Sequence, residues 1–335
     1  MTGGGRPRPA TIYDVARLAE VSHQTVAMYL RGHAGFRPET RSRVEQALAA
    51  LNYRPNRTAR ALATRTSYRI AALVSELLEV GPGKTLQGAA DRAREAGYLL
   101  DVVAINPRDV GSLNRALELV SSDEFAGVLA LAPVDLLLDR LTGTRFAAPL
   151  IAETELAGVP SINTVGLDLL VDHLADLGHR GFFYLGGPSA DWLAARNREH
   201  AYHAALARHG LTSLGQTCGD WSAASGHAAI DGAVLDVGVT ALVAANDQMA
   251  LGALLALGRR GLHLPRDVSV TGFDDIAEAA YFSPPLTTVR IDYASQGRRL
   301  VDRLLGLVDP GRVPADSGAE EPLLLVRSST GPAPS

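Results

Sequence analysis

Three residues in the second half of the chain have side chains that suit contact with a sugar. Trp221 lies in the segment GDWSAASG, and Asn246 and Asp274 each follow a short apolar run. An indole packs against the apolar face of a sugar ring, while a carboxamide or a carboxylate bonds to neighbouring hydroxyl groups. Asn and Asp after a strand also commonly cap the next helix, so capping is the alternative role for Asn246 and Asp274.

A segment that resembles a phosphate-binding loop occurs earlier in the chain. Residues 81–85 read GPGKT, but the motif requires a further glycine at the position held by Leu78. The segment therefore predicts the first turn of a helix rather than a nucleotide site. Lys84, the only lysine in the chain, remains a candidate for contact with an anionic effector.

The remaining reactive side chains do not form a catalytic or metal-binding pattern. His200 and His203 are spaced as a metal pair on a helix, but no third ligand accompanies them, so a solvated helix surface is the better interpretation. Cys218 is the only cysteine, and no Gly-x-Ser-x-Gly nucleophile motif is present. The sequence thus predicts no enzyme, no metal and no cofactor.

Charge is distributed unevenly along the chain. The net charge of the whole is −4, yet residues 1–66 hold eleven arginines and four acidic residues, which makes them +7 and the remainder −11. A basic segment on an acidic body indicates that a polyanion binds the first and another partner binds the second. The content of 47% hydrophobic and 20% charged residues is typical of a soluble folded protein.

The basic segment predicts three short helices within residues 11–53. Thr11 and Ser22 are placed to cap the first two, and Pro38 suits the first turn of the third. Two helices joined by a tight turn in a basic segment are typical of a helix-turn-helix. The apolar residues at helical spacing are Ile12, Val15, Ala16 and Ala19, then Val26 and Leu30, then Val44, Leu48 and Leu51.

In a helix-turn-helix the second helix enters the major groove and its first residues face the bases. Gln24 can bond to an adenine edge, and the side chains of Ala27 and Met28 can contact a thymine methyl. The predicted base-facing set is His23, Gln24, Thr25, Ala27 and Met28, and the predicted phosphate-contacting set is Arg31, Arg37, Arg41, Arg54 and Arg57.

Residues 56–65 consist of good helix formers with little apolar surface. A helix of about ten residues is marginal in water, so we expect a hinge that orders only on a partner. Leu62 is its one large apolar residue. A flexible linker is the alternative.

From Arg69 onward, short apolar runs alternate with helical patterns, which predicts parallel sheets with helices on both faces. The chain is long enough for two Rossmann-like subdomains with a ligand in the crevice at the carboxyl ends of the strands. Strands are predicted at 70–74, 99–103, 128–131, 182–185, 241–245 and 268–272, and helices at 84–96, 111–120, 167–177, 193–209, 223–235, 247–260 and 294–308.

Several segments resemble the LacI/GalR family of bacterial repressors. These are TIYDVARLAEVSHQTV at 11–26, PETRSRV at 38–44 and LNYRPN at 51–56, and in the body GDWSAASG at 219–226, ANDQMALGAL at 245–254, DVSVTGFDD at 267–275 and PPLTTV at 284–289. The resemblance implies a helix-turn-helix head on a two-lobed body of the periplasmic-binding-protein type. It departs at Glu20, where the family usually has glycine, and at Ala27 and Met28, where it often has Ser-Arg.

The resemblance also implies roles for individual residues. In a dimer, the hinge helices would pack in the minor groove at the operator centre, where Leu62 would wedge into a base step. Asp247 and Asp275 match structural positions. Effector-contact positions are Arg198, Trp221, Asn246, Asp274 and Tyr293; DNA-contact positions are Thr11, Tyr13, Ser22, His23, Gln24, Thr25, Ala27, Met28, Arg31, Asn56, Ala59 and Leu62.

We therefore expect a flexible N-terminal arm (1–9), a helix-turn-helix domain (10–54), a hinge helix (55–66) and an effector-binding and dimerisation core (67–335). Within the core, the N-lobe is expected at about 67–163 and 294–322, and the C-lobe at about 164–293 and 323–330.

These features predict a transcriptional repressor of carbohydrate-utilisation genes that binds a pseudo-palindromic double-stranded DNA operator and is released by a sugar or sugar-derived effector. A corepressor, or a phosphorylated or non-sugar effector, is the alternative, and a sugar-binding transport protein is a distant one. No apolar run could span a membrane, and no signal peptide or C-terminal leucine heptad helix is present. We expect a cytoplasmic, nucleoid-associated homodimer with no membrane partner.

Overall fold

The computed structural model of the protein describes residues 10–30, 33, 35–53, 67–75, 77–106, 109–131, 134–154, 161–190, 192–311 and 321–334. The chain divides into two compact units, Met1–Tyr68 and Arg69–Ser335, which we call the head and the body. No helix within the described residues combines the length and the apolar character that a bilayer crossing requires.

The described part of the head consists of three helices, α1 (Ile12–Leu18), α2 (His23–Leu30) and α3 (Pro38–Ala50). The predicted caps are present. The Thr11 hydroxyl accepts from the backbone N–H of Asp14 at 3.4 Å, and the Asp14 carboxylate accepts in return from the Thr11 N–H at 2.9 Å. Ser22 Oγ accepts from the Thr25 N–H at 3.1 Å. The core of the head is small and consists of Val15, Ala16, Ala19, Val26, Val44 and Ala47.

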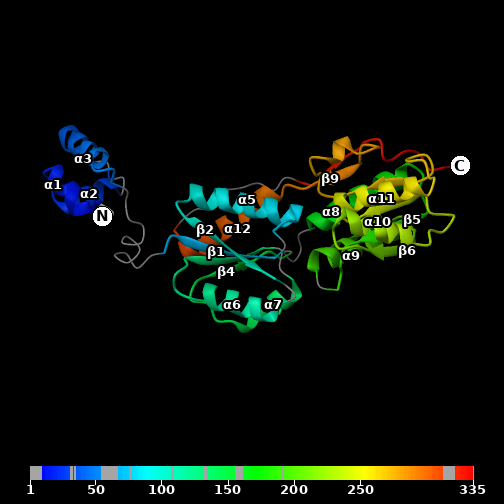
Figure 1. Ribbon diagram of the computed structural model, residues 1–335, viewed down its shortest axis with the longest axis horizontal. Helices are drawn as coiled ribbons and strands as arrows, with labels where there is room; N and C mark the ends of the chain where they lie inside the picture. The colour runs from blue at the N-terminus through cyan, green and yellow to red at the C-terminus, as the bar shows by residue number, and fades with distance from the viewer. Residues whose placement is uncertain are drawn as a thin grey trace, which may run out of the picture. The chain divides into compact units, whose positions relative to one another are not determined.

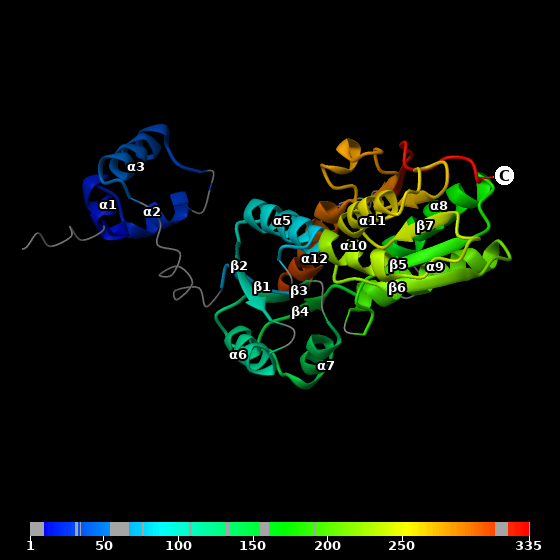
Figure 2. The same ribbon diagram turned by 45° about the vertical axis from the view of Figure 1, so that its right-hand side comes forward.

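The first sheet of the body is parallel, with strand order β2-β1-β3-β4. Its strands are β1 (Arg69–Ser75), β2 (Leu99–Ile105), β3 (Gly127–Leu131) and β4 (Leu150–Ala152). Helices α5 (Val80–Glu95) and α12 (Tyr293–Val308) cover one face, and α6 (Val110–Val120) and α7 (Asp135–Gly143) cover the other (Figures 1 and 2). Because helices pack on both faces, β3 is buried along its whole length. We call this part of the body the N-lobe.

Helices α5 and α12 lie so close together that their backbones touch. A Cβ atom at Gly88 would overlap the carbonyl oxygen of Ala294, and one at Gly297 would overlap the carbonyl oxygen of Thr85. A nearly buried ion pair joins the same helices, with Arg92 Nη2 at 2.6 Å from Asp302 Oδ1. Helix α12 is thereby fixed to the N-lobe although it follows the C-lobe in sequence.

The second sheet of the body is also parallel and repeats the topology of the first, with order β6-β5-β7-β8. We call this part the C-lobe. Its helices pack in two pairs, α8 with α9 and α10 with α11, and both pairs contact the sheet. The elements are α8 (Ile162–Asp176), β5 (Phe182–Gly186), α9 (Leu193–Arg208), β6 (Ser213–Cys218), α10 (Ala223–Gly232), β7 (Ala241–Ala244), α11 (Asp247–Arg259) and β8 (Ser269–Thr271). The prediction of two Rossmann-like parallel sheets is confirmed.

The chain passes between the lobes three times: after β4, between β9 (Thr288–Arg290) and α12, and between α12 and β10 (Leu323–Leu325). Strands β9 and β10 pair antiparallel.

The buried ring of His179 connects the C-lobe to the C-terminal segment. It lies 3.0 Å from both Thr240 Oγ1 and the Gly331 carbonyl oxygen, and burial lowers its pKa. The histidine therefore has a structural role.

Several elements differ from the sequence prediction. Helix α7 and strands β4, β6, β9 and β10 were not predicted, because they are short or, as in β6, alternate half-buried and exposed residues on a sheet edge. Helix α5 begins at Val80 rather than at 84, since Pro82 falls in the first turn, where its missing N–H costs nothing. Helix α8 begins at Ile162 rather than at 167, with Ser161 as its cap, so the first helix of the C-lobe begins before residue 164.

Candidate functional site

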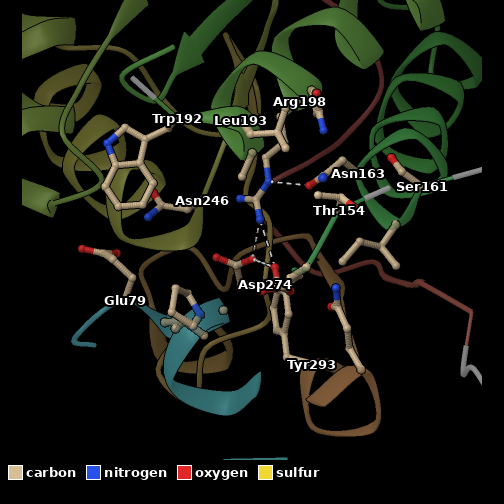
Figure 3. Close-up of a pocket in the computed structure, with 18 of the residues that line it drawn as sticks. Glu79, Thr154, Ser161, Asn163, Trp192, Leu193, Arg198, Asn246, Asp274 and Tyr293 are labelled. Atoms are coloured by element: carbon tan, nitrogen blue, oxygen red, sulfur yellow. Dashed lines mark hydrogen bonds and ion pairs between the residues drawn. The ribbon is translucent and has the colours of Figure 1, made fainter. Parts of the chain in front are cut away.

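A cavity of about 340 Å³ lies within the body and is walled by residues of both lobes (Figure 3). This volume falls in the range of small-molecule sites. The five residues predicted to contact an effector, Arg198, Trp221, Asn246, Asp274 and Tyr293, all line it. They come from five separate segments, which the C-lobe sheet and the start of α12 bring together.

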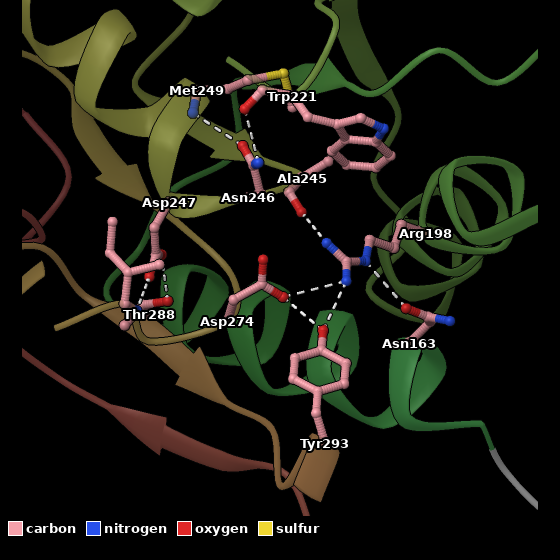
Figure 4. Close-up of polar contacts among 11 residues, drawn as sticks. Asn163, Arg198, Trp221, Ala245, Asn246, Asp247, Met249, Asp274, Thr288 and Tyr293 are labelled. Atoms are coloured by element: carbon pink, nitrogen blue, oxygen red, sulfur yellow. Dashed lines mark hydrogen bonds and ion pairs between the residues drawn. The ribbon is translucent and has the colours of Figure 1, made fainter. Parts of the chain in front are cut away.

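The Arg198 guanidinium is the centre of a hydrogen-bond cluster in this cavity (Figure 4). From α9, its Nε donates to Asn163 Oδ1 at 3.0 Å, and its Nη1 donates to the carbonyl oxygen of Ala245. Its Nη2 donates to Asp274 Oδ1 at 3.2 Å and to the Tyr293 hydroxyl at 2.9 Å, and that hydroxyl donates to Asp274 at 2.6 Å. The cation also lies 4.1 Å from the centre of the Phe273 ring. The side chain is thus held rigidly.

Burial is the largest influence on the pKa values of Asp274, Tyr293 and Arg198. It raises the pKa of Asp274 above the ordinary value, while the charge of Arg198 and the hydrogen bond from Tyr293 oppose that rise. Burial also raises the pKa of the Tyr293 hydroxyl. For Arg198, burial acts to lower the pKa, but the neighbouring Tyr293 and Asp274 outweigh it and the pKa is raised. Arg198 therefore stays charged at all physiological pH values.

Asn246 and Trp221 form a second, connected part of the wall. Asn246 caps α11, with its Oδ1 accepting from the Met249 N–H at 2.9 Å, and its Nδ2 donates to the Trp221 carbonyl oxygen at 2.9 Å. The capping role considered for Asn246 is therefore present, while the residue still borders the cavity. Trp221 and Asp274 have positive φ angles of 76° and 104°. Such backbone strain is common at ligand sites.

The two aspartates predicted to be structural make contacts that fit that role. Asp247 accepts from the Thr288 hydroxyl at 2.6 Å and from the Ile276 N–H at 2.8 Å, and burial raises its pKa to about 7. Asp275 pairs with Arg290 and Arg327, both at 2.8 Å. Burial acts to raise the pKa of Asp275, but these guanidinium groups lower it overall. Neither residue lines the cavity.

Other residues of the wall were missed by sequence reasoning. Asn163 contacts Arg198 directly, and Gln296, Arg299 and Arg303 line the cavity from α12. The last three form a polar stripe at helical spacing beside the apolar face of α12, which is the signal that could have revealed them. Further lining residues include Glu79, Glu153, Thr154, Ser161 and Trp192.

The alternative ligand sites considered from the sequence have ordinary surroundings. Residues 81–85 lie in the first turns of α5, and Lys84 is exposed and absent from the cavity wall. His200 and His203 are exposed on α9, and His203 bonds to Gln216 Oε1 at 2.9 Å. The described residues contain no group of three His, Cys, Asp or Glu side chains arranged to hold a metal ion.

In the head, helix α2 exposes the residues predicted to face bases. Ser22, His23, Gln24 and Met28 are exposed, while Thr25 and Ala27 are half-buried. The Tyr13 ring lies 5.1 Å from the His23 ring, measured between centres, and Thr11 is half-buried beside it in sequence. The exposed residues at the start of α2 are polar and uncharged or imidazole side chains, which suits the approach of this end of the helix to DNA.

The turn before α2 contains Glu20 at a φ of 53°, a left-handed conformation that favours glycine. The angle explains why the family usually has glycine at this position. Six predicted DNA contacts lie outside the described residues, as do the predicted N-terminal arm (1–9) and hinge helix (55–66). The six are Arg31, Arg54, Asn56, Arg57, Ala59 and Leu62.

The head and the body each match a known protein family. The family described as "Bacterial regulatory proteins, lacI family" matches residues 11–56, and the "Periplasmic binding protein-like domain" matches residues 171–330. The first match covers the three helices of the head, and the second covers most of the C-lobe.

Individual relatives match over nearly the whole chain. The lactose operon repressor of Escherichia coli (strain K12) is 34% identical over 308 residues, which are 90% of this chain and 85% of the relative. A crystal structure of the Lac repressor dimer bound to operator and the anti-inducer ONPF aligns with a TM-score of 0.83 at 31% identity, covering 97% of this chain and all of that one. The CelR–cellobiose complex, a transcriptional regulator, aligns with a TM-score of 0.68 at 28% identity, covering 96% and 99%.

Proposed function

Since this chain belongs to the LacI family of bacterial regulatory proteins, we propose that it represses carbohydrate-utilisation genes in the cytoplasm, at the nucleoid, and that a sugar or sugar-derived effector in the body releases it from its operator. Like the relatives that it matches, it is a DNA-binding transcriptional regulator and not an enzyme.

One observation carries the proposal: the chain that has a helix-turn-helix head also has a cavity walled by both lobes of its body. A ligand in such a cavity contacts both lobes at once, so it binds one lobe arrangement better than another. That difference in affinity is the coupling free energy available to change DNA binding. Trp221 and the Arg198 cluster offer the aromatic face and the fixed donors and acceptors that a sugar requires.

The first test identifies the operator. Selection of the full chain on random double-stranded DNA should yield a pseudo-palindrome, because two heads of a homodimer read two half-sites. Gln24→Ala should weaken binding to that site by about 1–3 kcal/mol if Gln24 reads a base. The matched control is Gln46→Ala, which removes an equally exposed glutamine from α3. Equal losses in the two variants would contradict the assignment of α2 as the base-reading helix.

The second test identifies the direction of the response. A panel of sugars is added to the selected operator complex, and release is followed by fluorescence anisotropy. Asp274→Asn should reduce the effector's affinity, since Asp274 lines the cavity and bonds to Arg198. If a sugar strengthens the operator complex, the effector is a corepressor rather than an inducer. If Asp274→Asn binds the effector as tightly as the wild-type protein does, the effector binds elsewhere.

The homodimer is supported by an exposed apolar surface on the C-lobe. Leu251 and Leu255 on α11 are 39% and 52% exposed, and Tyr281 is 87% exposed. Leu251 and Leu255 line one surface hollow together with Ser283, and exposed apolar side chains gathered in this way are typical of protein interfaces. Leu255→Asp should therefore produce monomers in analytical ultracentrifugation, whereas Leu119→Asp, a similarly exposed position on α6, should not.

For the hinge, Leu62 remains the proposed wedge at the operator centre. Leu62→Ala should weaken specific operator binding far more than effector binding, as measured by anisotropy and calorimetry on the same preparation. Equal losses in both measurements would remove the wedge hypothesis.

A further inference from the structure

Helix α12 presents a polar stripe to the cavity, formed by Gln296, Arg299 and Arg303. The spacing of these residues places them on one side of the helix, since positions three, four and seven apart share a face. Leu300 lies on the same side and also lines the cavity. The stripe therefore belongs to the N-lobe wall, while the Arg198 cluster belongs mainly to the C-lobe.

Two atoms of this stripe are buried without a partner. Arg299 Nη1 and Gln296 Oε1 are inaccessible to solvent and form no hydrogen bond. A buried donor or acceptor left unpaired destabilises the folded state, more so when it belongs to a charged group. Such groups are rare in folded proteins, and they distinguish this part of α12 from the rest of the helix.

The other charged residues of α5 and α12 that face each other are paired. Arg298 makes two hydrogen bonds to Glu95, at 3.0 and 2.6 Å, and Arg92 pairs with Asp302 at 2.6 Å. In contrast, neither Arg299 nor Arg303 has a carboxylate within ion-pairing distance among the described residues. Both residues border the cavity, Arg299 half-buried and Arg303 exposed.

We propose that the effector carries an anionic group, a carboxylate or a phosphate, which Arg299 and Arg303 bind from the α12 side of the cavity. This inference rests on the proposed function and names the chemical class of the effector. A guanidinium binds a carboxylate or phosphate through two parallel N–H donors, which makes these pairs strong and specific. Arg299 and Arg303 both line the cavity, so an anionic group there would meet two guanidinium groups from one face of α12.

The acidic residues of the wall are consistent with this ligand. Glu79 and Glu153 also line the cavity, and each already has an interaction partner within the chain. Their oxygens, like those of Asp274, accept hydrogen bonds from hydroxyl groups. The cavity therefore suits a polyhydroxylated ligand with its anion at α12 and its ring toward Trp221, as in a sugar acid or a sugar phosphate.

The test compares neutral sugars with their own anions on the full chain. Glucose and galactose are each measured by calorimetry beside the corresponding uronate and 6-phosphate. The anion of at least one pair should bind tenfold or more tightly than its neutral parent, and the uronate and phosphate arms distinguish the two sources of charge. Arg299→Gln should abolish this preference and leave the affinity for the neutral parent within about twofold.

The matched control is Arg298→Gln, which removes the same charge from the adjacent position on the same helix but outside the cavity. It should retain the preference. Inorganic phosphate serves as a second probe: it should raise the melting temperature of the wild-type protein and of Arg298→Gln, but not that of Arg299→Gln, at equal ionic strength.

The outcomes separate this inference from the proposed function. If neutral sugars release the operator and bind as tightly as their anions, or if the preference survives in Arg299→Gln, the anion site is overturned while the proposed function stands. If no sugar, neutral or charged, affects the operator complex, the proposed function is overturned, and the phosphate measurement alone then decides whether Arg299 binds an anion.

Discussion

Replacing Tyr293 by phenylalanine tests the hydrogen-bond cluster of the cavity with the smallest possible change. The Tyr293 hydroxyl donates to Asp274 at 2.6 Å and accepts from Arg198 at 2.9 Å, and the residue is buried. Tyr293 begins α12, which packs against α5 of the N-lobe, whereas Arg198 and Asp274 belong to the C-lobe. The hydroxyl is therefore a polar contact between the lobes, and the substitution removes it while keeping the ring.

The magnitude follows from the two lost hydrogen bonds. A hydrogen bond to a charged group contributes about 1.5–3 kcal/mol, and Arg198 and Asp274 can still bond to each other at 3.2 Å. We expect Tyr293→Phe to lower the free energy of unfolding of the body by about 2–4 kcal/mol. For a unit of this size, each kcal/mol corresponds to about 2–4 °C, so the melting temperature should fall by roughly 4–16 °C.

The substitution should also change the pH dependence of stability. Burial raises the pKa of Asp274 in the folded state, and the hydrogen bond from Tyr293 opposes this rise. A carboxyl group with a raised folded pKa stabilises the protein at low pH and loses that contribution as the pH rises. Without the hydroxyl the folded pKa rises further, so the deficit of Tyr293→Phe should be larger at pH 8 than at pH 5.

The assay is urea denaturation at both pH values, with Tyr13→Phe as the control. Tyr13 lies in the head and is 61% exposed, so removal of its hydroxyl should change stability by less than about 0.5 kcal/mol. If the two variants lose equal stability, or if the Tyr293→Phe deficit does not grow with pH, the hydroxyl does not join the charged pair in the way described.

Three further predictions follow from single residues. Burial raises the pKa of Asp247 to about 7, so its contribution to the free energy of unfolding declines as the pH rises from about 4 to about 7; Asp247→Asn should remove up to about 4 kcal/mol of this decline, as measured by urea denaturation across that range. Glu20→Gly should stabilise the head by about 1 kcal/mol because φ at this position is 53°, which hydrogen exchange of head amides will show as slower exchange; unchanged rates would contradict it. Asp302→Asn leaves Arg92 without its buried partner and should lower stability by about 3–5 kcal/mol in thermal unfolding, whereas a loss below about 1 kcal/mol would show that the pair is solvated.

The sequence predicted the central strands well because burial on both faces gives them continuous apolar runs. β3 and β7 have no exposed residue and were found from such runs. The edge strand β6 has Gln216 and Thr217 among its residues and alternates in burial, so it lacks the run. β4 is only three residues long, and no local pattern distinguishes it from a loop.

The residues of the candidate site likewise fall into those that the sequence predicts and those that it does not. Trp221, Asn246 and Asp274 could be predicted because they follow strands or strand-like runs, and parallel strands bring their carboxyl ends to one edge. Arg299 could not, because its position in the cavity depends on the packing of α12 against the other lobe, which is set by the close approach at Gly88 and Gly297. Contacts that depend on such a crossing have no local sequence signal beyond the polar stripe itself.

The contacts between the lobes also indicate where a ligand can act. Arg196 of α9 in the C-lobe pairs with Asp135 of α7 in the N-lobe at 2.5 Å, but the two side chains are 37% and 46% exposed. An exposed pair contributes about 0–1 kcal/mol, whereas moving a two-state population from 1:99 to 99:1 requires about 5.5 kcal/mol of differential binding. This exposed pair alone therefore cannot hold one arrangement against the other. The buried contacts of Tyr293 with Arg198 and Asp274, for which we expect about 2–4 kcal/mol, supply a larger share of that difference. A ligand that joins α12 to the Arg198 cluster thus acts beside these buried contacts between the lobes.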